Sequence, residues 1–261
     1  MRSRTHERKS RKFKIFLVFV FLIAAVSFYS SGKINQFLKK LTTPSPAKLK
    51  EMIKDLIIDD LDYFLNALKE AQLKQIKRQK EEASEKISQY QSDLYSSKNS
   101  PIAGNPQSSV TLAYFFDYNC GYCHKANTIL NNILASDKDI KLVYKELPIL
   151  GPQSTQLAKA ALAVHFVAPD KYIAFHNNLM TSEEVDFKNI LDSLEIPQAE
   201  VLAKMESSEV QEQLAEVTKL ATTIGLSGTP SLIIGNDLVG SMDETALRNH
   251  IEQIRKNTTH E

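Results

Sequence analysis

The chain carries its two cysteines in the stretch Phe115-Phe116-Asp117-Tyr118-Asn119-Cys120-Gly121-Tyr122-Cys123-His124. The apolar run over residues 110–116 predicts a buried strand leading into this stretch, and residues 124–135 predict a helix leading out of it. A Cys-x-x-Cys pair where a strand passes into a helix is typical of thiol–disulfide exchange. The sequence therefore predicts a redox-active pair at the start of a helix.

The two sulfurs are expected to have different tasks. At the helix N-terminus, the dipole and the free backbone N–H groups stabilise a thiolate on Cys120. Cys123 lies one turn further along, close enough to attack a mixed disulfide and release it. The alternatives are two inert core residues or half of a zinc site. Zinc needs about four ligands, and the chain has no third cysteine and no paired motif among its six histidines. We expect no metal and no cofactor.

The N-terminus has the composition of an export signal. Residues 1–32 hold seven Lys and Arg residues and one acid, although the whole chain has a net charge of +1. The apolar run 15–28 is shorter than the roughly 20 residues of a membrane span. The signal is either cleaved or kept as an inner-membrane anchor over residues 15–29. Both alternatives predict that the rest of the chain lies in the periplasm or another extracytoplasmic space. That remainder is net acidic, which argues against nucleic-acid binding.

Residues 33–98 predict a helical stalk. Apolar residues recur there at steps of three and four, and the pattern thins after Leu68. The stripe comprises Leu49, Met52, Ile53, Leu56, Ile57, Leu61, Phe64, Leu65 and Leu68, followed by Ile76, Ala83, Ile87, Tyr90 and Leu94. Such a stripe must be buried. It packs either on the chain's own domain or, over residues 47–98, against a second copy in a homodimer. Residues 99–106 are expected to form a linker.

The remaining chain, residues 99–258, predicts one α/β domain. Strands at 110–116 and 140–147 are expected to pair in parallel across the helix between them. Helices at 152–167, up to 181, 185–194 and 198–224 form a helical insertion, in which His165 and His176 are expected to be structural. A hairpin over 231–240 and a helix over 242–256 close the domain. Thr229-Pro230 precedes the hairpin. The proline is either an ordinary turn residue or a cis proline that turns the Thr229 backbone toward Cys120.

Taken together, the chain resembles the DsbA-like family of thioredoxin-fold disulfide oxidoreductases. The matching motifs are residues 116–123, Lys145-Glu146-Leu147-Pro148-Ile149-Leu150-Gly151 and Gly225-Leu226-Ser227-Gly228-Thr229-Pro230. The resemblance covers about residues 100–258. It implies a thioredoxin fold with a helical insertion over about 152–224, Cys120 as nucleophile, Cys123 as resolving cysteine and Pro230 as a cis proline. It also implies cysteine-containing exported substrates and a membrane redox partner. The helical front is similar to that of exported members with an oligomerisation segment.

Two departures from the family pattern bear on the reaction. Strongly oxidising members carry Cys-Pro-His-Cys and a Val before the cis proline. Gly121, Tyr122 and Thr229 instead resemble disulfide isomerases of the DsbC type. Gly121 and Tyr122 supply no cation to a thiolate, and His124 compensates in part, so we expect a potential between about −120 and −270 mV. Thr229, Pro230 and Tyr122 are expected to contact substrate.

Lys145 and Glu146 form either a proton relay for Cys123 or a surface ion pair. The function expected from all these features is that of an exported protein disulfide oxidoreductase and isomerase. A dedicated thiol reductant is one alternative. The other is an oligomeric surface or chaperone protein with little redox turnover.

Overall fold

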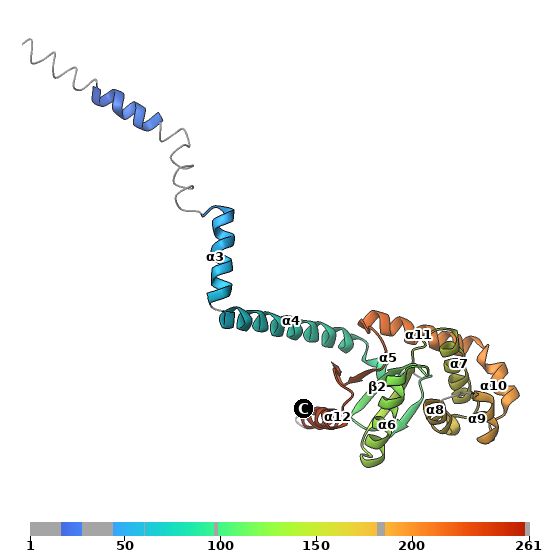
Figure 1. Ribbon diagram of the computed structural model, residues 1–261. Helices are drawn as coiled ribbons and strands as arrows, with labels where there is room; N and C mark the ends of the chain where they lie inside the picture. Colours follow the sequence, from blue (N-terminus) through green and yellow to red (C-terminus); the bar gives the residue numbers. More distant parts are fainter. Residues whose placement is uncertain (1–16, 28–43, 60, 97–98, 182–185, 259–261) are drawn as a thin grey trace, which may run out of the picture. The chain divides into compact units, whose positions relative to one another are not determined.

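The computed structural model describes residues 17–27, 44–59, 61–96, 99–181 and 186–258 (Figure 1). They fall into two units, residues 1–73 and 74–261. In the first unit, residues 17–27 are helical, and the rest of the expected export signal lies outside the described residues. Of the helices that are described, none has both the length and the apolar character needed to cross a membrane.

The stalk consists of α3 (Pro46–Asp59), α4 (Leu61–Gln89) and α5 (Gln91–Tyr95). The two ends of its apolar stripe differ in burial. Ile87 and Leu94 belong to the second unit and are fully buried there, in a cluster with Phe115 and Ile233. The earlier part of the stripe is exposed, at Leu49, Met52, Ile53, Leu61, Leu65 and Leu68. The end of the stripe therefore packs on the chain's own domain, whereas its beginning is left uncovered.

The second unit contains a five-stranded sheet in the order β1-β3-β2-β4-β5. The strands are β1 (Ile102–Gly104), β2 (Thr111–Phe116), β3 (Lys141–Glu146), β4 (Ser231–Ile234) and β5 (Asp237–Leu238). As predicted, β2 and β3 are parallel, and β4 and β5 form an antiparallel hairpin. β4 also lies antiparallel to β2, so the chain before β4 reaches the carboxyl end of β2.

The linker predicted over residues 99–106 is wrong for its central part, because β1 pairs there with β3 as an edge strand. This strand is held to β3 by backbone hydrogen bonds over residues 102–104. Backbone hydrogen bonds do not depend on apolar side chains, so the sequence shows no periodic pattern here. Gly104 has φ +81°, and a Cβ atom there would lie 2.2 Å from the Ile140 carbonyl oxygen. A side chain is therefore excluded at this position.

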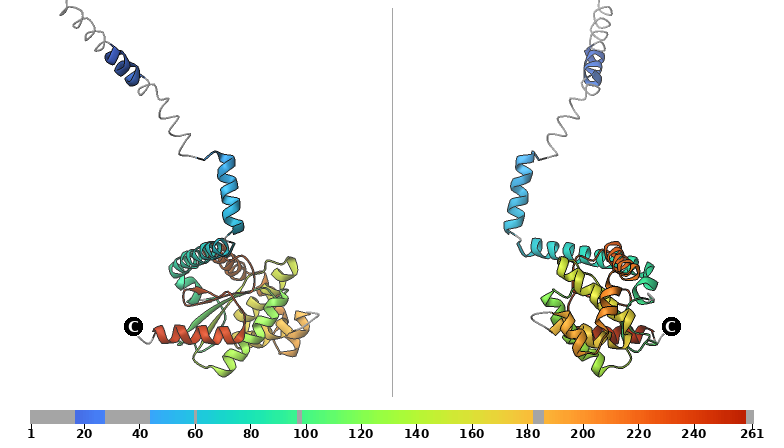
Figure 2. Two further views of the ribbon diagram at one scale, coloured as in Figure 1. Left: turned by 60° about the vertical axis from the view of Figure 1, so that its left-hand side comes forward. Right: turned by 90° about the vertical axis from the view of Figure 1, so that its right-hand side faces the viewer.

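The sheet has helices on both faces. The cluster on one face joins Tyr114 and Phe116 of β2 to α6 (Gly121–Ser136) and α12 (Glu244–Thr258). Figure 2 shows α6 and α12 close together. On the other face, Ala113 and Phe115 pack against α11 (Ser208–Ile224) and the end of the stalk. Successive β2 side chains thus enter different cores, as strand geometry requires.

Helices also make up the insertion between β3 and β4. They are α7 (Pro152–Val167), a short 3₁₀ turn (Pro169–Lys171), α8 (Tyr172–Thr181), α9 (Phe187–Ser193), α10 (Gln198–Met205) and α11. The single helix predicted over 198–224 is wrong, since α10 and α11 are separate. Ser207 begins α11, and its side-chain oxygen accepts a hydrogen bond from the Val210 N–H. Such an N-cap fixes a new helix start.

Candidate active site

The cysteine pair lies where β2 turns into α6. Cys120 is the N-cap of α6, and the N–H groups of Cys123 and His124 point back to the Cys120 carbonyl. Both cysteines are free thiols. Cys120 keeps 8% of its surface exposed, whereas Cys123 is fully buried. The arrangement presents one sulfur to a partner and keeps the other beneath it.

Thr229 lies beside the cysteine pair. The Thr229–Pro230 peptide bond is cis, as the resemblance implied, so the alternative of an ordinary turn proline is wrong. The thiol of Cys120 donates to the Thr229 carbonyl oxygen at 3.4 Å. The Thr229 side chain also acts on Cys123, because its hydroxyl lowers the pKa of that thiol against the larger effect of burial. The sequence predicted the contact with Cys120 but not the effect on Cys123.

Burial dominates the chemistry of Cys123. Loss of solvent raises the pKa of its thiol to about 12, although the Asp117 backbone and the Thr229 hydroxyl act in the opposite direction. The Tyr114 hydroxyl donates to the Cys123 carbonyl oxygen at 3.0 Å. Burial and the nearby Cys123 and Cys120 sulfurs raise the pKa of Tyr114 well above its ordinary value. Tyr114 therefore stays protonated and serves as a donor rather than a base.

Asp117 organises the loop in front of Cys120. Its buried carboxylate accepts the Asn119 N–H at one oxygen, at 2.8 Å. The other oxygen accepts the N–H groups of Ile149 and Leu150, at 2.8 and 2.9 Å. This single side chain therefore joins the loop before α6 to the loop after β3. Sequence reasoning included Asp117 in a motif but assigned it no role.

The two residues between the cysteines are exposed, whereas His124 is half-buried. Tyr122 is 73% exposed, and the Lys125 ammonium lies 5.7 Å from the centre of its ring. A Cβ atom at Gly121 would meet open space. The His124 ring is held by Nε2, which lies 2.7 Å from the Tyr118 carbonyl oxygen. Tyr122 is thus available to a partner, and His124 is anchored to the backbone before Cys120.

Lys145 and Glu146 are both buried, so the prediction that they form an ion pair on the surface is wrong. Lys145 pairs in register with Phe115 and Glu146 with Phe116, which places the two side chains on opposite faces of the sheet. The Lys145 ammonium donates to the Asp93 carbonyl and to the Ser100 hydroxyl. Burial lowers its pKa to about 8. Lys145 therefore holds the stalk end, on the face away from Cys123.

Glu146 lies on the same face as Cys123, within a buried polar network. Burial raises the pKa of its carboxyl to about 7, although the Tyr172 hydroxyl, which donates to it at 2.6 Å, favours the ionised form. Nearby, the Tyr118 hydroxyl lies 3.0 Å from Nδ1 of His176, and Nε2 of that ring lies 3.0 Å from the Asn127 amide oxygen. Burial lowers the pKa of His176 to about 3, so the ring is neutral and structural.

A metal centre is not formed by the residues that the structure describes, since no three His, Cys, Asp or Glu side chains come together among them. The site consists of two thiols, the backbone and hydroxyl of Thr229, and the donor groups beneath them. Such a set can form and break disulfide bonds without a bound group.

The comparison with models of protein families shows to which family the chain belongs. The family model of the DSBA-like thioredoxin domain matches residues 111–252, more than half of the chain. The chain belongs to this family. As a DsbA-like protein it is a member of the thiol–disulfide oxidoreductases, and the cysteine pair, the cis proline and the helical insertion all lie within the matched residues.

Solved structures agree with this assignment. A thioredoxin-like oxidoreductase from Silicibacter pomeroyi is 34% identical, with a TM-score of 0.60 over 63% of this chain and 97% of that one. The thiol-disulfide exchange protein alpha-DsbA2 from Wolbachia pipientis is 30% identical, with a TM-score of 0.62 over 66% and 95%. A linker-deletion variant of Proteus mirabilis ScsC, 23% identical, shares the fold over 83% and 99%, with a TM-score of 0.61. The comparison with curated proteins finds no match.

Proposed function

We propose that this DsbA-like protein is an exported enzyme that isomerises and forms disulfide bonds in other exported proteins. The observation that carries the proposal is the pairing of a partly exposed Cys120 at a helix N-terminus with a buried Cys123 one turn along. The Thr229 backbone carbonyl accepts a hydrogen bond from the Cys120 thiol, at the place where a substrate must approach.

The reaction begins at Cys120. Its thiolate attacks one sulfur of a substrate disulfide, forming a Cys120–substrate bond while the other substrate sulfur leaves and takes up a proton. In isomerisation, a different substrate thiolate attacks the Cys120-bound substrate sulfur and frees Cys120 with no net oxidation. In disulfide formation, the oxidised Cys120–Cys123 pair accepts two electrons from substrate thiols, and a membrane redox partner reoxidises the pair.

Cys123 supports the isomerase assignment. To resolve a mixed disulfide Cys123 must ionise, and burial, the largest cause that raises the pKa of this thiol, disfavours its thiolate. Slow resolution lengthens the life of the Cys120–substrate bond. The substrate's own thiols then have time to attack, which is the step that rearranges a wrong pairing. Gly121 and Tyr122, which add no cation between the sulfurs, favour the same outcome.

Recovery of activity by scrambled ribonuclease tests the proposal. The wild-type chain should restore activity, Cys120→Ser should not, and Cys123→Ser should retain part of the rescue because substrate thiols can complete the cycle. Failure of the wild type, or equal rescue by Cys120→Ser, refutes the proposal. A redox titration together with the oxidation state of Cys120 in the cell separates the enzyme classes. A wholly oxidised pair indicates a dedicated oxidant, and a reduced pair indicates an isomerase or reductant.

Export is supported by the N-terminal sequence, in which a strongly basic segment precedes an apolar run. The periplasm supplies both the unpaired cysteines of newly exported proteins and an oxidising environment. Cell fractionation tests the location, and mass measurement of the mature N-terminus distinguishes a cleaved leader from an anchor. Recovery of the intact chain in the cytosol would contradict the assignment.

A homodimer through the stalk is part of the proposal. Six apolar residues of the stripe are exposed in the single chain, namely Leu49, Met52, Ile53, Leu61, Leu65 and Leu68. Their exposure is costly in water and is relieved when the same residues of a second copy cover them. Two copies would bring two Cys120 sites into one assembly. A substrate held at one site could then be attacked at the other, which suits isomerisation.

A further inference from the structure

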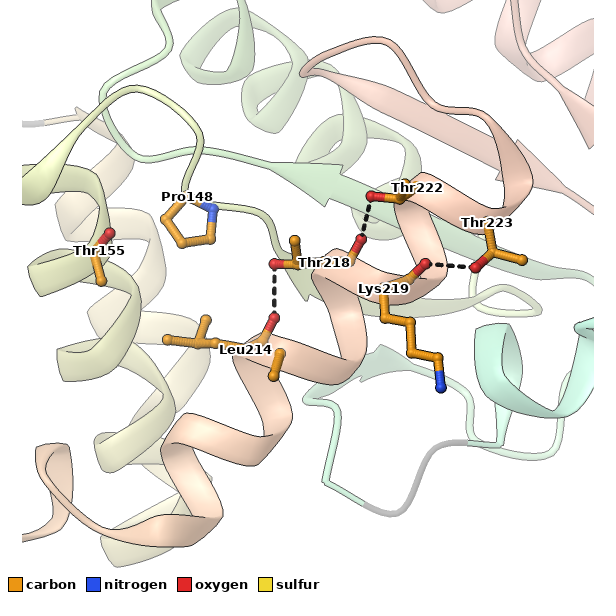
Figure 3. A pocket seen from close by; sticks show the side chains of 8 residues that line it. Pro148, Thr155, Leu214, Thr218, Lys219, Thr222 and Thr223 are labelled. Carbon is orange, nitrogen blue, oxygen red and sulfur yellow. Dashed lines mark hydrogen bonds between the residues drawn. The ribbon is translucent and has the colours of Figure 1, made fainter.

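Helix α11 borders two cavities, which differ in the state of their polar groups. The first lies between α11 and α7 and is drawn in Figure 3. The hydroxyls of Thr218, Thr222 and Thr223 there each donate to a carbonyl of their own helix, so none of these protons is free for a ligand. The second cavity, of about 610 Å³, lies between α11 and the end of the stalk. We call it the stalk-end cavity, and its lining includes Tyr90, Asp93, Lys145, Gln213, Glu216 and Lys219.

The floor of the stalk-end cavity consists of two buried polar side chains. Lys145 of β3 and Gln213 of α11 line the cavity, yet each keeps only 1% of its surface exposed. Both are held by the hydroxyl of Ser100, to which the Lys145 ammonium and the Gln213 amide donate at 2.9 and 3.0 Å. The two side chains are therefore fixed from below, as a binding site requires.

This floor has hydrogen-bonding groups that the fold leaves unpaired. Lys145 can donate three hydrogen bonds. Its second goes to the Asp93 carbonyl at 2.6 Å, which leaves one N–H without a partner among the described residues. The Gln213 amide oxygen is buried and accepts no hydrogen bond from the residues that the structure describes. If the amide is turned over, its NH₂ group takes the unpaired place instead. Burial of such groups without a partner costs free energy, and a ligand that reaches them removes that cost.

The charged groups around the cavity balance one another. Its lining carries two ammonium groups, of Lys145 and Lys219, and two carboxylates, of Asp93 and Glu216. Figure 3 shows Lys219 extending from α11 away from α7. Burial lowers the pKa of Lys145 to about 8, although nearby carboxylates, including Asp93 and Glu216, act in the opposite direction. An anion would meet the two carboxylates, and a cation the two ammonium groups. The cavity therefore suits a ligand without net charge.

A ligand rich in hydroxyl groups fits this set of partners. A hydroxyl both donates and accepts, so it can pair with the Lys145 N–H and with the Gln213 amide in either orientation. A zwitterion is also uncharged overall, but the carboxylate that Lys145 would attract only accepts and cannot pair with the Gln213 amide oxygen. Tyr90, Val217 and Leu220 add apolar surface to the lining, against which ring carbons can pack. The volume lies within the range of about 300–1,000 Å³ that is typical of ligand sites.

We propose that the stalk-end cavity binds a neutral sugar ring, with Lys145 and Gln213 at its floor and Asp93 and Glu216 at its rim. A free monosaccharide and the terminal residue of a glycan both present this chemistry. The site does not depend on the disulfide exchange, because Lys145 lies on the face of the sheet away from Cys123. A bound sugar would contact both α11 and the stalk end, and would hold the stalk end more firmly on the domain.

Saturation-transfer NMR of the full chain tests the cavity. The probes are glucose, galactose and N-acetylglucosamine, each as the monosaccharide and as a linear trisaccharide. Glycine, phosphate and putrescine represent a zwitterion, an anion and a cation. At least one sugar should bind with a Kd of about 1 mM, as expected for a ligand of this size, and should slow hydrogen exchange in α5. Tighter binding of the trisaccharide supports a glycan end as the ligand, and equal or weaker binding supports a free sugar.

Two variants locate the binding. Gln213→Leu removes the amide from the floor and should weaken sugar binding about tenfold. Gln211→Leu, the same change at an exposed position of α11 outside the lining, is the matched control. Glu216→Gln should weaken binding about threefold to fivefold, since a neutral acceptor makes weaker hydrogen bonds than a carboxylate. Glu212→Gln, exposed on the same helix, is its control. Thermal melts check that each variant is folded.

Three results would overturn the proposal. They are no signal from any sugar at millimolar concentration, binding of the charged or zwitterionic probes alone, and sugar binding that a folded Gln213→Leu leaves unchanged. If Gln213→Leu does not fold, Glu216→Gln at the surface decides in its place. In each of these cases the unpaired groups of the floor would be binding water and no sugar.

Discussion

The thiol of Cys120 and the carbonyl oxygen of Thr229 lie 3.4 Å apart and share a hydrogen bond. The bond exists only while the sulfur carries its proton, because a thiolate has none to donate. Ionisation of Cys120 therefore frees the carbonyl oxygen at the moment when the sulfur becomes a nucleophile. A substrate backbone N–H can then take the vacated position, as in pairing with a strand edge. In the proposed reaction, ionisation of Cys120 would therefore also open the position at which Thr229 pairs with a substrate.

Thr229→Val should lengthen the life of the mixed disulfide. Valine keeps the shape of threonine but lacks the hydroxyl that lowers the pKa of the Cys123 thiol against the effect of burial. With less thiolate available, resolution by Cys123 should slow by about threefold to tenfold. Rapid-quench measurement of the enzyme–peptide disulfide gives the rate. Thr128→Val, which removes a hydroxyl from an exposed position of α6, is the matched control. An unchanged lifetime would contradict the contact.

Glu146→Gln should change how stability depends on pH. Burial raises the pKa of the Glu146 carboxyl from 4.5 to about 7 in the folded chain. Between these values the folded chain holds a proton that the unfolded chain releases, so stability falls as pH rises, by up to about 3 kcal/mol. Glutamine keeps an acceptor for Tyr172 and does not ionise. Relative to wild type, the variant should therefore gain stability from pH 5 to pH 8.

Urea denaturation of both proteins at pH 5 and pH 8 measures this gain. The difference between wild type and Glu146→Gln isolates one group, because the other titrating residues are common to both. A difference that stays constant with pH would mean that the carboxyl ionises as easily in the folded chain as in the unfolded one.

The central strands could be predicted from the sequence because β2 and β3 are covered on both faces and each contains an apolar run, over residues 112–116 in β2 and 142–144 in β3. The edge strand β1 could not, since three residues held by backbone bonds leave no periodic signal. The cysteine pair and the proline could be found from the sequence because Cys-x-x-Cys and Thr-Pro are short motifs. Each can be recognised from adjacent residues without knowledge of the fold.

The residues that contact the cysteine pair and its loop from within the fold could not be predicted in the same way. Tyr114 reads as one more apolar residue of a strand, and only the fold brings its hydroxyl under the Cys123 carbonyl. Asp117 acts on Ile149 and Leu150, more than thirty residues away, so no local spacing reports the contact. Lys145 and Glu146 are adjacent in sequence, and the strand separates them onto two faces. Sequence patterns report local turns and periodicity, and these contacts depend on neither.

Leu65→Glu should convert the proposed dimer into a monomer. Leu61, Leu65 and Leu68 are exposed and share one face of α4, because residues three and four apart lie above one another on a helix. A charge at the centre of that face cannot be buried against a second copy without a large desolvation cost. Sedimentation equilibrium of residues 33–261 measures the mass. Asn66→Glu, at an exposed polar position beside it, is the control and should stay dimeric. A wild-type monomer at micromolar concentration would refute the interface.

Asp117→Asn should destabilise the domain and release the loop after β3. The carboxylate accepts three backbone N–H groups, from Asn119 at one oxygen and from Ile149 and Leu150 at the other. An amide has one acceptor oxygen and one NH₂ group, which only donates, so in either orientation the NH₂ group meets an N–H donor. The buried mismatch should cost about 2–4 kcal/mol and lower Tm by about 5–15 °C. Asp170→Asn, at an exposed position, is the control for loss of charge and should melt like wild type. Hydrogen exchange at Ile149 and Leu150 reports the loop directly: if both amides stayed protected in Asp117→Asn, the carboxylate would not be what holds this loop against the cysteines.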